Sequence, residues 1–134
     1  MLAFIALGSN VGDRAKHLAA ARHAIAALPD TFIVAASDIE ETEPLGGLQQ
    51  ENYLNQMLAV KTALEPMQLL SELQGIEIAN GRTRGERWAP RTLDLDIVAY
   101  GDTALASAQL TLPHPGLAQR DFWRREMAQL EERL

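Results

Sequence analysis

The sequence predicts an α+β fold with the element order strand, helix, strand, strand, helix, strand, followed by one further helix. Apolar runs of strand length alternate with segments in which Leu and Ile recur at helical spacing. Pro, Gly and Asp residues stand between these segments, where one element should end and the next begin. Strands that alternate with helices in this order favour a layered fold with the helices packed on a sheet.

A strand and a helix come first. The run "LAFIAL" at 2–7 is apolar throughout, which is typical of a buried strand. The first helix is expected from about 14 to 28, because apolar side chains recur there at helical spacing: Leu18, Ala21, Ile25 and Leu28. Asp13 is a suitable N-cap residue, and "PD" at 29–30 ends the helix. The stretch "GSNVGDR" between the two elements lacks the Lys-Ser/Thr ending of a phosphate-binding P-loop and is interpreted as a turn.

Two strands follow the first helix. The run "FIVAASD" at 32–38 predicts the second strand, and "ETEPLGGLQQEN" at 41–52 predicts a loop punctuated by Pro and Gly. The run "YLNQMLAVKT" at 53–62 predicts a long third strand. Because successive side chains of a strand point to opposite faces, Tyr53, Asn55 and Met57 should share one face. Leu54, Leu58 and Val60 should share the other.

The second half repeats the helix and strand pattern. Pro66 should open the second helix, whose apolar stripe is Leu69, Leu70, Leu73 and Ile76, and Gly81 should end it. The run "TLDLDIVAY" at 92–100 predicts the fourth strand, and a polar helix should run from about 119 to the end. The resulting order is the ferredoxin-like βαββαβ pattern with an antiparallel sheet and an additional C-terminal helix. We expect a single domain over 1–134.

Composition restricts the class of protein. The chain has 134 residues, of which 47% are hydrophobic and 22% charged, as in globular domains. It has no cysteine, which excludes disulfides and thiolate sites and suits a reducing cytoplasm. The net charge of −6 argues against a broad nucleic-acid-binding face, and no apolar run reaches the ~18 residues of a membrane span. We expect a cytoplasmic monomer without nucleic-acid or membrane partners.

One loop differs from this acidic background. The stretch "RTRGERWAPR" at 82–91 contains one acid, Glu86, and four arginines: Arg82, Arg84, Arg87 and Arg91. The planar guanidinium group suits bidentate contacts with phosphate or carboxylate. The loop therefore indicates a site for an anion.

Two acids follow this loop on the fourth predicted strand. Asp94 and Asp96 are two residues apart, so their side chains should share a face, with Leu93, Leu95 and Ile97 packed on the other. A carboxylate pair repels itself unless a cation lies between, and oxygen ligands of this kind suit Mg²⁺. Taken alone, such a pair is more often two exposed acids at a strand edge. The adjacent arginines favour a site for metal ions and phosphates.

The combined motif resembles a known family. The stretch "RWAPRTLDLDIV" at 87–98 is similar to the signature of 6-hydroxymethyl-7,8-dihydropterin pyrophosphokinases, which fixes a basic residue, a small residue, Arg and the acid pair at set spacing. The resemblance extends from about residue 5 to about residue 122. It implies a ferredoxin-like enzyme of folate biosynthesis, a Mg²⁺-dependent diphosphotransferase. Such an enzyme moves pyrophosphate from ATP to the hydroxymethyl group of 6-hydroxymethyl-7,8-dihydropterin and releases AMP.

The resemblance implies roles for residues around the phosphates. Asp94 and Asp96 would hold two Mg²⁺ ions, and Arg82 and Arg91 would be catalytic, because they contact the phosphates during transfer. ATP, the co-substrate, would be bound by ten residues: Gln74, Glu77, Arg84, Arg87, Trp88, Arg91, Ile97, Thr111, His114 and Arg120. Gln74 and Glu77 lie off the apolar stripe of their helix, so we expect them on its solvent side.

The resemblance also implies a pterin pocket. The residues that would line it are Thr42, Pro44, Leu45, Tyr53, Asn55, Trp88 and Phe122. A flat ring that is rich in hydrogen-bonding groups needs aromatic faces and an amide at its edge. The stacking rings would be Trp88 and Phe122, and the Asn55 amide can both donate and accept.

Two departures from the family pattern leave an alternative open. Gln109 stands where many members carry a basic residue, and the segment after Phe122, "WRREMAQLEERL", is polar and short. The chain thus resembles a C-terminally short member. The alternative is a non-catalytic or altered-specificity paralogue that binds pterin or nucleotide. An RNA-binding module is disfavoured, because it would need a basic sheet face, whereas the net charge of the chain is negative.

Overall fold

The computed structural model describes residues 1–43, 52–81 and 92–134. Its elements within these ranges are β1 (Leu2–Ser9), α1 (Arg14–Ala26), β2 (Thr31–Ala36), β3 (Glu40–Thr42), β4 (Tyr53–Thr62), α2 (Pro66–Ala79), β5 (Asp94–Tyr100), β6 (Leu105–Ala106), β7 (Thr111–Leu112), the 3₁₀ helix η1 (Pro115–Ala118) and α3 (Asp121–Arg133). The predicted α+β class is confirmed. None of the helices in these ranges has the length and hydrophobicity of a membrane span.

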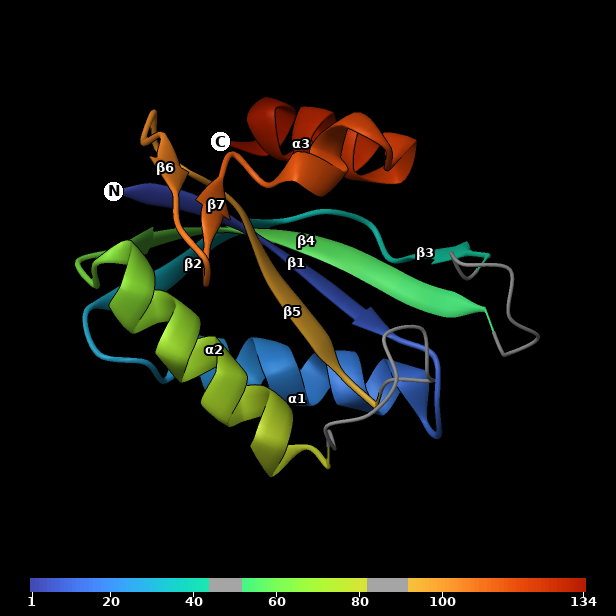
Figure 1. The fold of residues 1–134 in the computed structure, drawn as a ribbon. Helices are drawn as coiled ribbons and strands as arrows, with labels where there is room; N and C mark the ends of the chain where they lie inside the picture. The colour runs from blue at the N-terminus through green and yellow to red at the C-terminus, as the bar shows by residue number, and fades with distance from the viewer. Residues whose placement is uncertain (44–51, 82–91) are drawn as a thin grey trace.

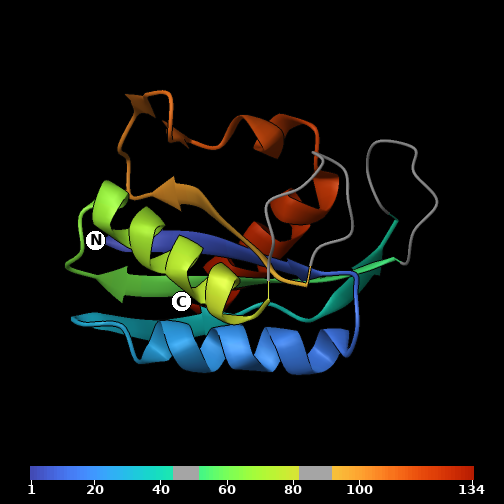
Figure 2. The same ribbon diagram turned by 60° about the horizontal axis from the view of Figure 1, so that its bottom comes forward.

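The main sheet has the strand order β2-β4-β1-β5, and every neighbouring pair is antiparallel. The short β3 extends it by pairing with β4, and β6 and β7 form a separate hairpin. This order is the ferredoxin-like arrangement that the sequence predicts. Figures 1 and 2 show α1 and α2 on one face of the sheet and α3 on the opposite face.

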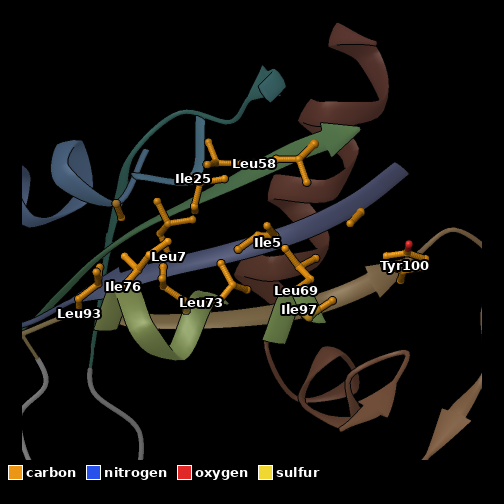
Figure 3. Packing of buried hydrophobic residues seen from close by; sticks show 14 of the residues in the cluster. Ile5, Leu7, Ile25, Leu58, Leu69, Leu73, Ile76, Leu93, Ile97 and Tyr100 are labelled. Atoms are coloured by element: carbon orange, nitrogen blue, oxygen red, sulfur yellow. The ribbon is translucent and has the colours of Figure 1, made fainter. Parts of the chain in front are cut away.

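The larger core lies between the sheet and the helices α1 and α2 (Figure 3). Alternate residues of β1 and β5 enter it, including Ile5, Leu7 and Ile97, and the predicted stripes of both helices meet them there. Full burial of one such side chain stabilises the fold by about 1.5–3 kcal/mol. The spacing of apolar residues therefore explains which helix faces meet the sheet.

Local signals at the helix ends are largely confirmed. The Asp13 side chain caps α1 by accepting a hydrogen bond from the Lys16 N–H at 3.1 Å. Gly81 follows the end of α2 with a φ of 87°, a left-handed conformation that suits glycine. The first helix ends at Ala26, two residues earlier than predicted.

Three short strands were not predicted. The strand β3 includes two residues of the predicted loop at 41–52, so that boundary was wrong. The strands β6 and β7 have two residues each, too few to show an alternating pattern in the sequence. All three depend on a partner strand that brings its hydrogen-bonding groups into register.

A second, smaller core lies under α3. It contains Ala6, Met57, Val98 and, from the helix, Trp123 and Leu130. Although α3 is polar in composition, these last two side chains form a buried stripe on its inner face. The description of this helix as simply polar was therefore incomplete.

One acid is buried in the same stripe. Glu126 is only 2% exposed, and burial raises the pKa of its carboxyl group from 4.5 to about 9. Burial is the largest cause of this increase in pKa, the Glu40 carboxyl group also contributes to it, and Arg125 opposes it. Because the neutral form fits this site and the ionised form does not, the group makes stability depend on pH.

We predict that the free energy of unfolding falls as the pH rises from about 4.5 to about 9. Glu126 is protonated in both states below this window, whereas within it only the folded state keeps the proton. This group alone should therefore contribute a slope of about 1.4 kcal/mol per pH unit. In Glu126→Gln this contribution to the slope should be absent. Urea denaturation of both proteins at several pH values measures the difference.

Glu132→Gln is the control, because Glu132 is exposed on the same helix. Its pH dependence should match that of the wild type. Parallel curves for the wild type and Glu126→Gln would contradict the prediction.

Candidate active site

A cleft with a volume of ≈ 230 Å³ lies along the outer edge of β5. Its walls come from α2, β5, the turn of the β6–β7 hairpin and the start of η1. Four residues assigned to ATP or metal by the resemblance line it: Asp96, Ile97, Thr111 and His114. Gln109, the departure from the family pattern, lines it as well. Tertiary structure thus gathers residues from three separate stretches of the chain.

The acid pair lies on the α3 face of the sheet. In the β1–β5 register, Asp94 is paired with Gly8 and Asp96 with Ala6. Ala6 belongs to the core under α3, and paired residues of neighbouring strands point to the same face. Leu95 and Ile97 are buried in the opposite core. The two carboxylates therefore share one face of β5, as the period-two pattern predicts.

His114 is held next to Asp96. Its Nε2 lies 3.6 Å from Oδ1 of Asp96, and its Nδ1 accepts a hydrogen bond of 2.9 Å from the Gly116 N–H. Because Nδ1 accepts, the proton of the neutral ring is on Nε2 and faces the carboxylate. The backbone N–H of His114 donates to the Val98 carbonyl at 2.9 Å, which joins this segment to β5. His114 therefore presents one N–H donor to the cleft.

Trp123 links two of the predicted ATP residues. The His114 ring meets it edge-on at 4.9 Å between centroids, and the Arg120 guanidinium carbon lies 4.6 Å from the centre of its ring. Such a cation–π contact stabilises the position of the arginine. Gly116 has no side chain, and a Cβ atom there would overlap the Arg120 guanidinium group. Trp123 was not among the predicted site residues, because only its neighbour Phe122 matched the family pattern.

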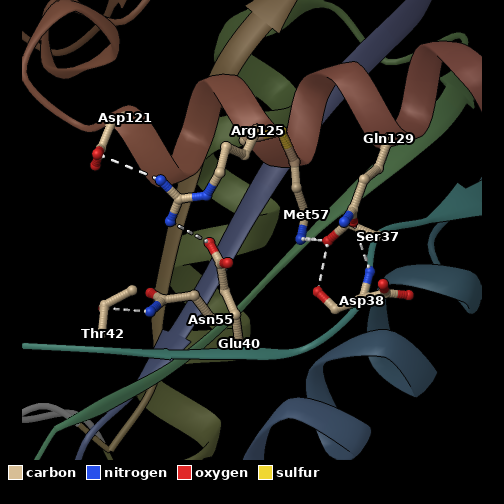
Figure 4. A network of polar contacts seen from close by, with 9 residues as sticks. All are labelled: Ser37, Asp38, Glu40, Thr42, Asn55, Met57, Asp121, Arg125 and Gln129. Carbon is tan, nitrogen blue, oxygen red and sulfur yellow. Dashed lines mark hydrogen bonds and ion pairs between the residues drawn. The ribbon is translucent and has the colours of Figure 1, made fainter.

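The predicted pterin residues that the structure describes lie at the other end of the same face. Asn55 is buried, and its Nδ2 donates to the Thr42 hydroxyl at 2.6 Å (Figure 4). Within the ranges that the structure describes, this bond leaves Oδ1 and the second N–H of the amide for a ligand. Tyr53 is half-buried two residues earlier on the same strand. Phe122 packs half-buried against the core under α3, with its ring centroid 6.4 Å from that of Trp123.

Gly8 separates the two ends of the site. It is paired with Asn55 on one side and with Asp94 on the other, so the three form one row across the sheet. A Cβ atom at this position would lie 3.3 Å from both Oδ1 of Asn55 and Cδ1 of Tyr53. The missing side chain leaves a flat floor between the amide and the carboxylate. In the sequence, the only signal of this role is the stretch "GSN", which begins with Gly8 and follows the first predicted strand.

Glu77 corrects one prediction about α2. Gln74 is exposed as expected, but Glu77 is 6% exposed, and its Oε2 accepts a hydrogen bond of 2.8 Å from the Leu95 N–H. The solvent-side interpretation was wrong, because β5 packs against this flank of the helix and covers it. Glu77 thereby fixes the edge of the strand that carries both acids.

Several predicted residues lie outside the described ranges. They are Pro44, Leu45, Arg82, Arg84, Arg87, Trp88 and Arg91. Gln74, which the resemblance assigns to ATP, is described by the structure but does not line the cleft. Most of the other predicted residues fall into two groups on either side of β1, one around Asp96 of β5 and one around Asn55 of β4.

The described carboxylates fit a magnesium ion that is bound together with phosphates. No cluster of three or more His, Cys, Asp or Glu side chains that could hold a metal occurs in the ranges 1–43, 52–81 and 92–134. Asp94 and Asp96 supply oxygen ligands only, and both are half-buried. Mg²⁺ is commonly bound by one or two carboxylates together with substrate phosphates and water, so two acids beside a cleft are sufficient.

We predict that Glu77→Leu destabilises the protein by about 1–3 kcal/mol, because the buried N–H of Leu95 then lacks an acceptor. Glu77→Gln keeps an acceptor oxygen and should lose less. Gln74→Leu, on the exposed side of the same helix, should change stability by no more than about 0.5 kcal/mol. Urea denaturation measures all three. Equal stabilities of Glu77→Leu and Gln74→Leu would contradict the role of this bond.

Comparisons with known proteins agree with the geometry. The model of the family "7,8-dihydro-6-hydroxymethylpterin-pyrophosphokinase (HPPK)" matches residues 4–132. The chain is 43% identical over 120 residues to the 2-amino-4-hydroxy-6-hydroxymethyldihydropteridine pyrophosphokinase of Haemophilus influenzae, covering 90% of this chain and 75% of that protein. The proteins of the same name from Pseudomonas aeruginosa and Bacillus subtilis are 41% identical over 119 residues and 43% identical over 124 residues. The aligned regions cover 89% and 90% of this chain, and 74% and 72% of those proteins. The chain belongs to the 7,8-dihydro-6-hydroxymethylpterin-pyrophosphokinase family.

Proposed function

We propose that this protein transfers pyrophosphate from ATP to the hydroxymethyl group of 6-hydroxymethyl-7,8-dihydropterin, a step of folate biosynthesis. The products are AMP and the pterin diphosphate. Family membership supports this reaction, and the observation that carries it is the row Asn55, Gly8, Asp94 on one face of the sheet. In this row the Asn55 amide would recognise the ring and the Asp94 carboxylate would serve phosphate chemistry, on either side of Gly8.

The spacing of this row suits a flat bicyclic ring. Neighbouring strands lie about 4.8 Å apart, so Asn55 and Asp94 are separated by about 10 Å across β1. A pterin that lies over Gly8 with its hydrogen-bonding edge on Asn55 would point its hydroxymethyl group toward Asp94 and Asp96. Stacking against Trp88 and Phe122 remains part of this proposal, as do the contacts of Pro44 and Leu45.

The phosphate end of the site would hold the triphosphate chain of ATP. We assign Asp94 and Asp96 to two Mg²⁺ ions, which would neutralise phosphate charge. His114 and Thr111 line the cleft, and we propose that the His114 Nε2–H and the Thr111 hydroxyl group would donate hydrogen bonds to phosphate oxygens. The arginines of the loop at 82–91, above all Arg82 and Arg91, would contact the same oxygens. The remaining ATP contacts are proposed for Gln74, Glu77, Ile97 and Arg120.

The reaction is an in-line displacement. The hydroxymethyl oxygen forms a bond to the β-phosphorus of ATP, and the bond from that phosphorus to the oxygen of the α-phosphate breaks. The electron pair leaves with AMP, and the hydroxyl proton is released. Catalysis comes from positioning and from charge stabilisation, because this transfer needs little covalent chemistry from the protein.

A non-catalytic or altered-specificity paralogue is the second candidate. Gln109 lines the cleft as a neutral side chain, where the family pattern often has a basic one. Calorimetry with a nonhydrolysable ATP analogue and Mg²⁺, followed by an AMP-release assay with ATP and reduced hydroxymethylpterin, separates the two candidates. Binding without AMP release would favour the paralogue.

We also propose that the protein is a single domain and acts as a cytoplasmic monomer without nucleic-acid partners.

We predict that Asp96→Asn lowers the rate of AMP formation by about two orders of magnitude or more, because charge stabilisation at the phosphates is lost. The coupled AMP-release assay, run over a range of MgCl₂ concentrations, measures the effect. Asp102→Asn, an exposed acid just beyond β5, should behave as the wild type. Undiminished turnover in Asp96→Asn would rule out the assignment of this carboxylate.

We predict that Gly8→Ala raises the KM for the pterin by about tenfold while the KM for ATP stays unchanged. The added Cβ would lie within 3.3 Å of Asn55 and Tyr53 and would lift the ring from the floor. Gly75→Ala is the matched control, since a Cβ at Gly75 has no neighbour within 4 Å. Steady-state kinetics with each substrate varied in turn measures both constants. An unchanged pterin KM in Gly8→Ala would place the ring elsewhere.

A further inference from the structure

The stretch "GSNVGDR" at 8–14 ends in Arg14, a residue that has no role in the proposed reaction. Gly12 turns the chain between β1 and α1 with a φ of 70°, a left-handed conformation that suits glycine. Asp13 then caps α1, so that Arg14 is its first residue. A cation in the first turn faces the positive end of the helix dipole, which is unfavourable unless partners outside the helix compensate.

The Arg14 side chain has two such partners, one on β3 and one next to β4. Its Nη1 donates a hydrogen bond of 2.7 Å to Oε1 of Glu41 and another of 2.7 Å to the backbone carbonyl of Asn52. This nitrogen carries two N–H groups, so it can make both bonds. Figures 1 and 2 show the start of α1 at the same end of the sheet as β3 and the start of β4. Arg14 therefore connects the two strands where β3 ends and β4 begins.

The face of the sheet opposite Glu41 is the one that carries the proposed site. Glu41 is paired with Leu54, which packs against the core under α1 and α2. Thr42 is paired with Tyr53, and because both follow or precede that pair by one residue, they point to the other face. On that face Thr42 accepts the hydrogen bond from the Asn55 amide (Figure 4). The bonds of Arg14 therefore reach the strands from behind the proposed pterin pocket.

Each bond of Arg14 lies one residue away from the pair on the site face. Glu41 comes directly before Thr42, and Asn52 comes directly before Tyr53. β3 has only three residues and, within the described ranges, pairs with β4 alone, so few backbone bonds hold it in place. The helix α1 packs against β1, β2 and β4, which gives Arg14 a fixed support. Its two bonds therefore restrict how far β3 can move from β4.

We propose that Arg14 is a positioning residue for pterin recognition, which fixes Thr42 and Tyr53 and, through Thr42, the Asn55 amide. This inference rests on the proposed function. It gives the turn between β1 and α1 a part in substrate recognition, although its sequence indicated only a turn. Arg14 acts from the opposite face of the sheet, through β3 and the start of β4.

The surface position of Arg14 allows this role to be tested without loss of the fold. The Arg14 side chain is 27% exposed and the Glu41 side chain 51% exposed, and ion pairs as exposed as this one contribute little to stability. Substitution of Arg14 should therefore leave the protein folded. The effect should appear in pterin recognition instead.

The first test is steady-state kinetics of Arg14→Met with each substrate varied in turn. Met keeps an unbranched apolar side chain but donates no hydrogen bond, so the KM for the pterin should rise about three- to tenfold. The kcat and the KM for ATP should stay unchanged, because the phosphate end of the site lies on the other side of β1. Lys16→Met removes the same charge at an exposed position of the same helix and should behave as the wild type. An unchanged pterin KM in Arg14→Met, or an equal rise in Lys16→Met, would overturn the inference.

A double-variant cycle tests whether Arg14 acts through Glu41. Glu41→Ala removes one of the two acceptors, so its KM for the pterin should lie between those of the wild type and Arg14→Met. The variant with both substitutions should match Arg14→Met, because Glu41 then has no bond to Arg14 left to lose. Additive effects of the two substitutions would contradict the proposed route.

A second readout does not require activity. Binding of 6-hydroxymethylpterin, measured by calorimetry with a nonhydrolysable ATP analogue and Mg²⁺ present, should weaken by the same factor in Arg14→Met. Amide hydrogen exchange at residues 40–42 should be faster in this variant than in the wild type. If the wild type binds the pterin but releases no AMP, the proposed catalysis fails while these measurements still decide the role of Arg14. Wild-type pterin affinity in Arg14→Met, or no pterin binding by the wild type, would overturn the inference.

Discussion

The pairing of β1 with both β4 and β5 is the constraint on which the site depends. Because β1 is central and its side chains alternate between faces, one strand supplies Ile5 and Leu7 to the core under α1 and α2. The same strand supplies Ala6 and Gly8 to the other face. A shift of one residue in this register would turn both Asp94 and Asp96 toward the larger core. Burial of the apolar residues therefore fixes where the carboxylates point.

The outer edge of β5 is closed by one side chain and one backbone N–H group instead of another strand of the main sheet. Glu77 accepts from the Leu95 N–H, and the His114 N–H donates to the Val98 carbonyl. These two bonds satisfy backbone groups that an edge strand would otherwise present to solvent or to another chain. They also fix α2 and the segment after β7 against the strand, and the cleft lies between these elements. The same contacts thus stabilise the fold and shape the proposed ATP site.

The helix α3 covers the opposite face with a small apolar stripe and several polar contacts. Gln129 accepts from the Asp38 N–H, and Arg133 donates to the Ala36 carbonyl and pairs with Asp38 (Figure 4 shows the first of these). Together with the Arg125–Glu40 pair they connect the helix to the chain between β2 and β4. Individually such exposed pairs contribute little to stability. Their role is to set where the helix lies over the sheet.

The sequence by itself determined the element order, the apolar stripes of α1 and α2, the Asp13 cap and the shared face of Asp94 and Asp96. Each of these depends on spacing along one segment, which strand and helix periodicity convert directly into geometry. The resemblance indicated the chemistry, because the motif at 87–98 lies within one stretch of chain. Only the tertiary structure decided that Glu77 is buried, that Gly8 separates Asn55 from Asp94, and that Trp123 and Glu126 of α3 are buried against the sheet. These features depend on which segments pack together, and contacts between distant parts of the chain leave no periodic signal in the sequence.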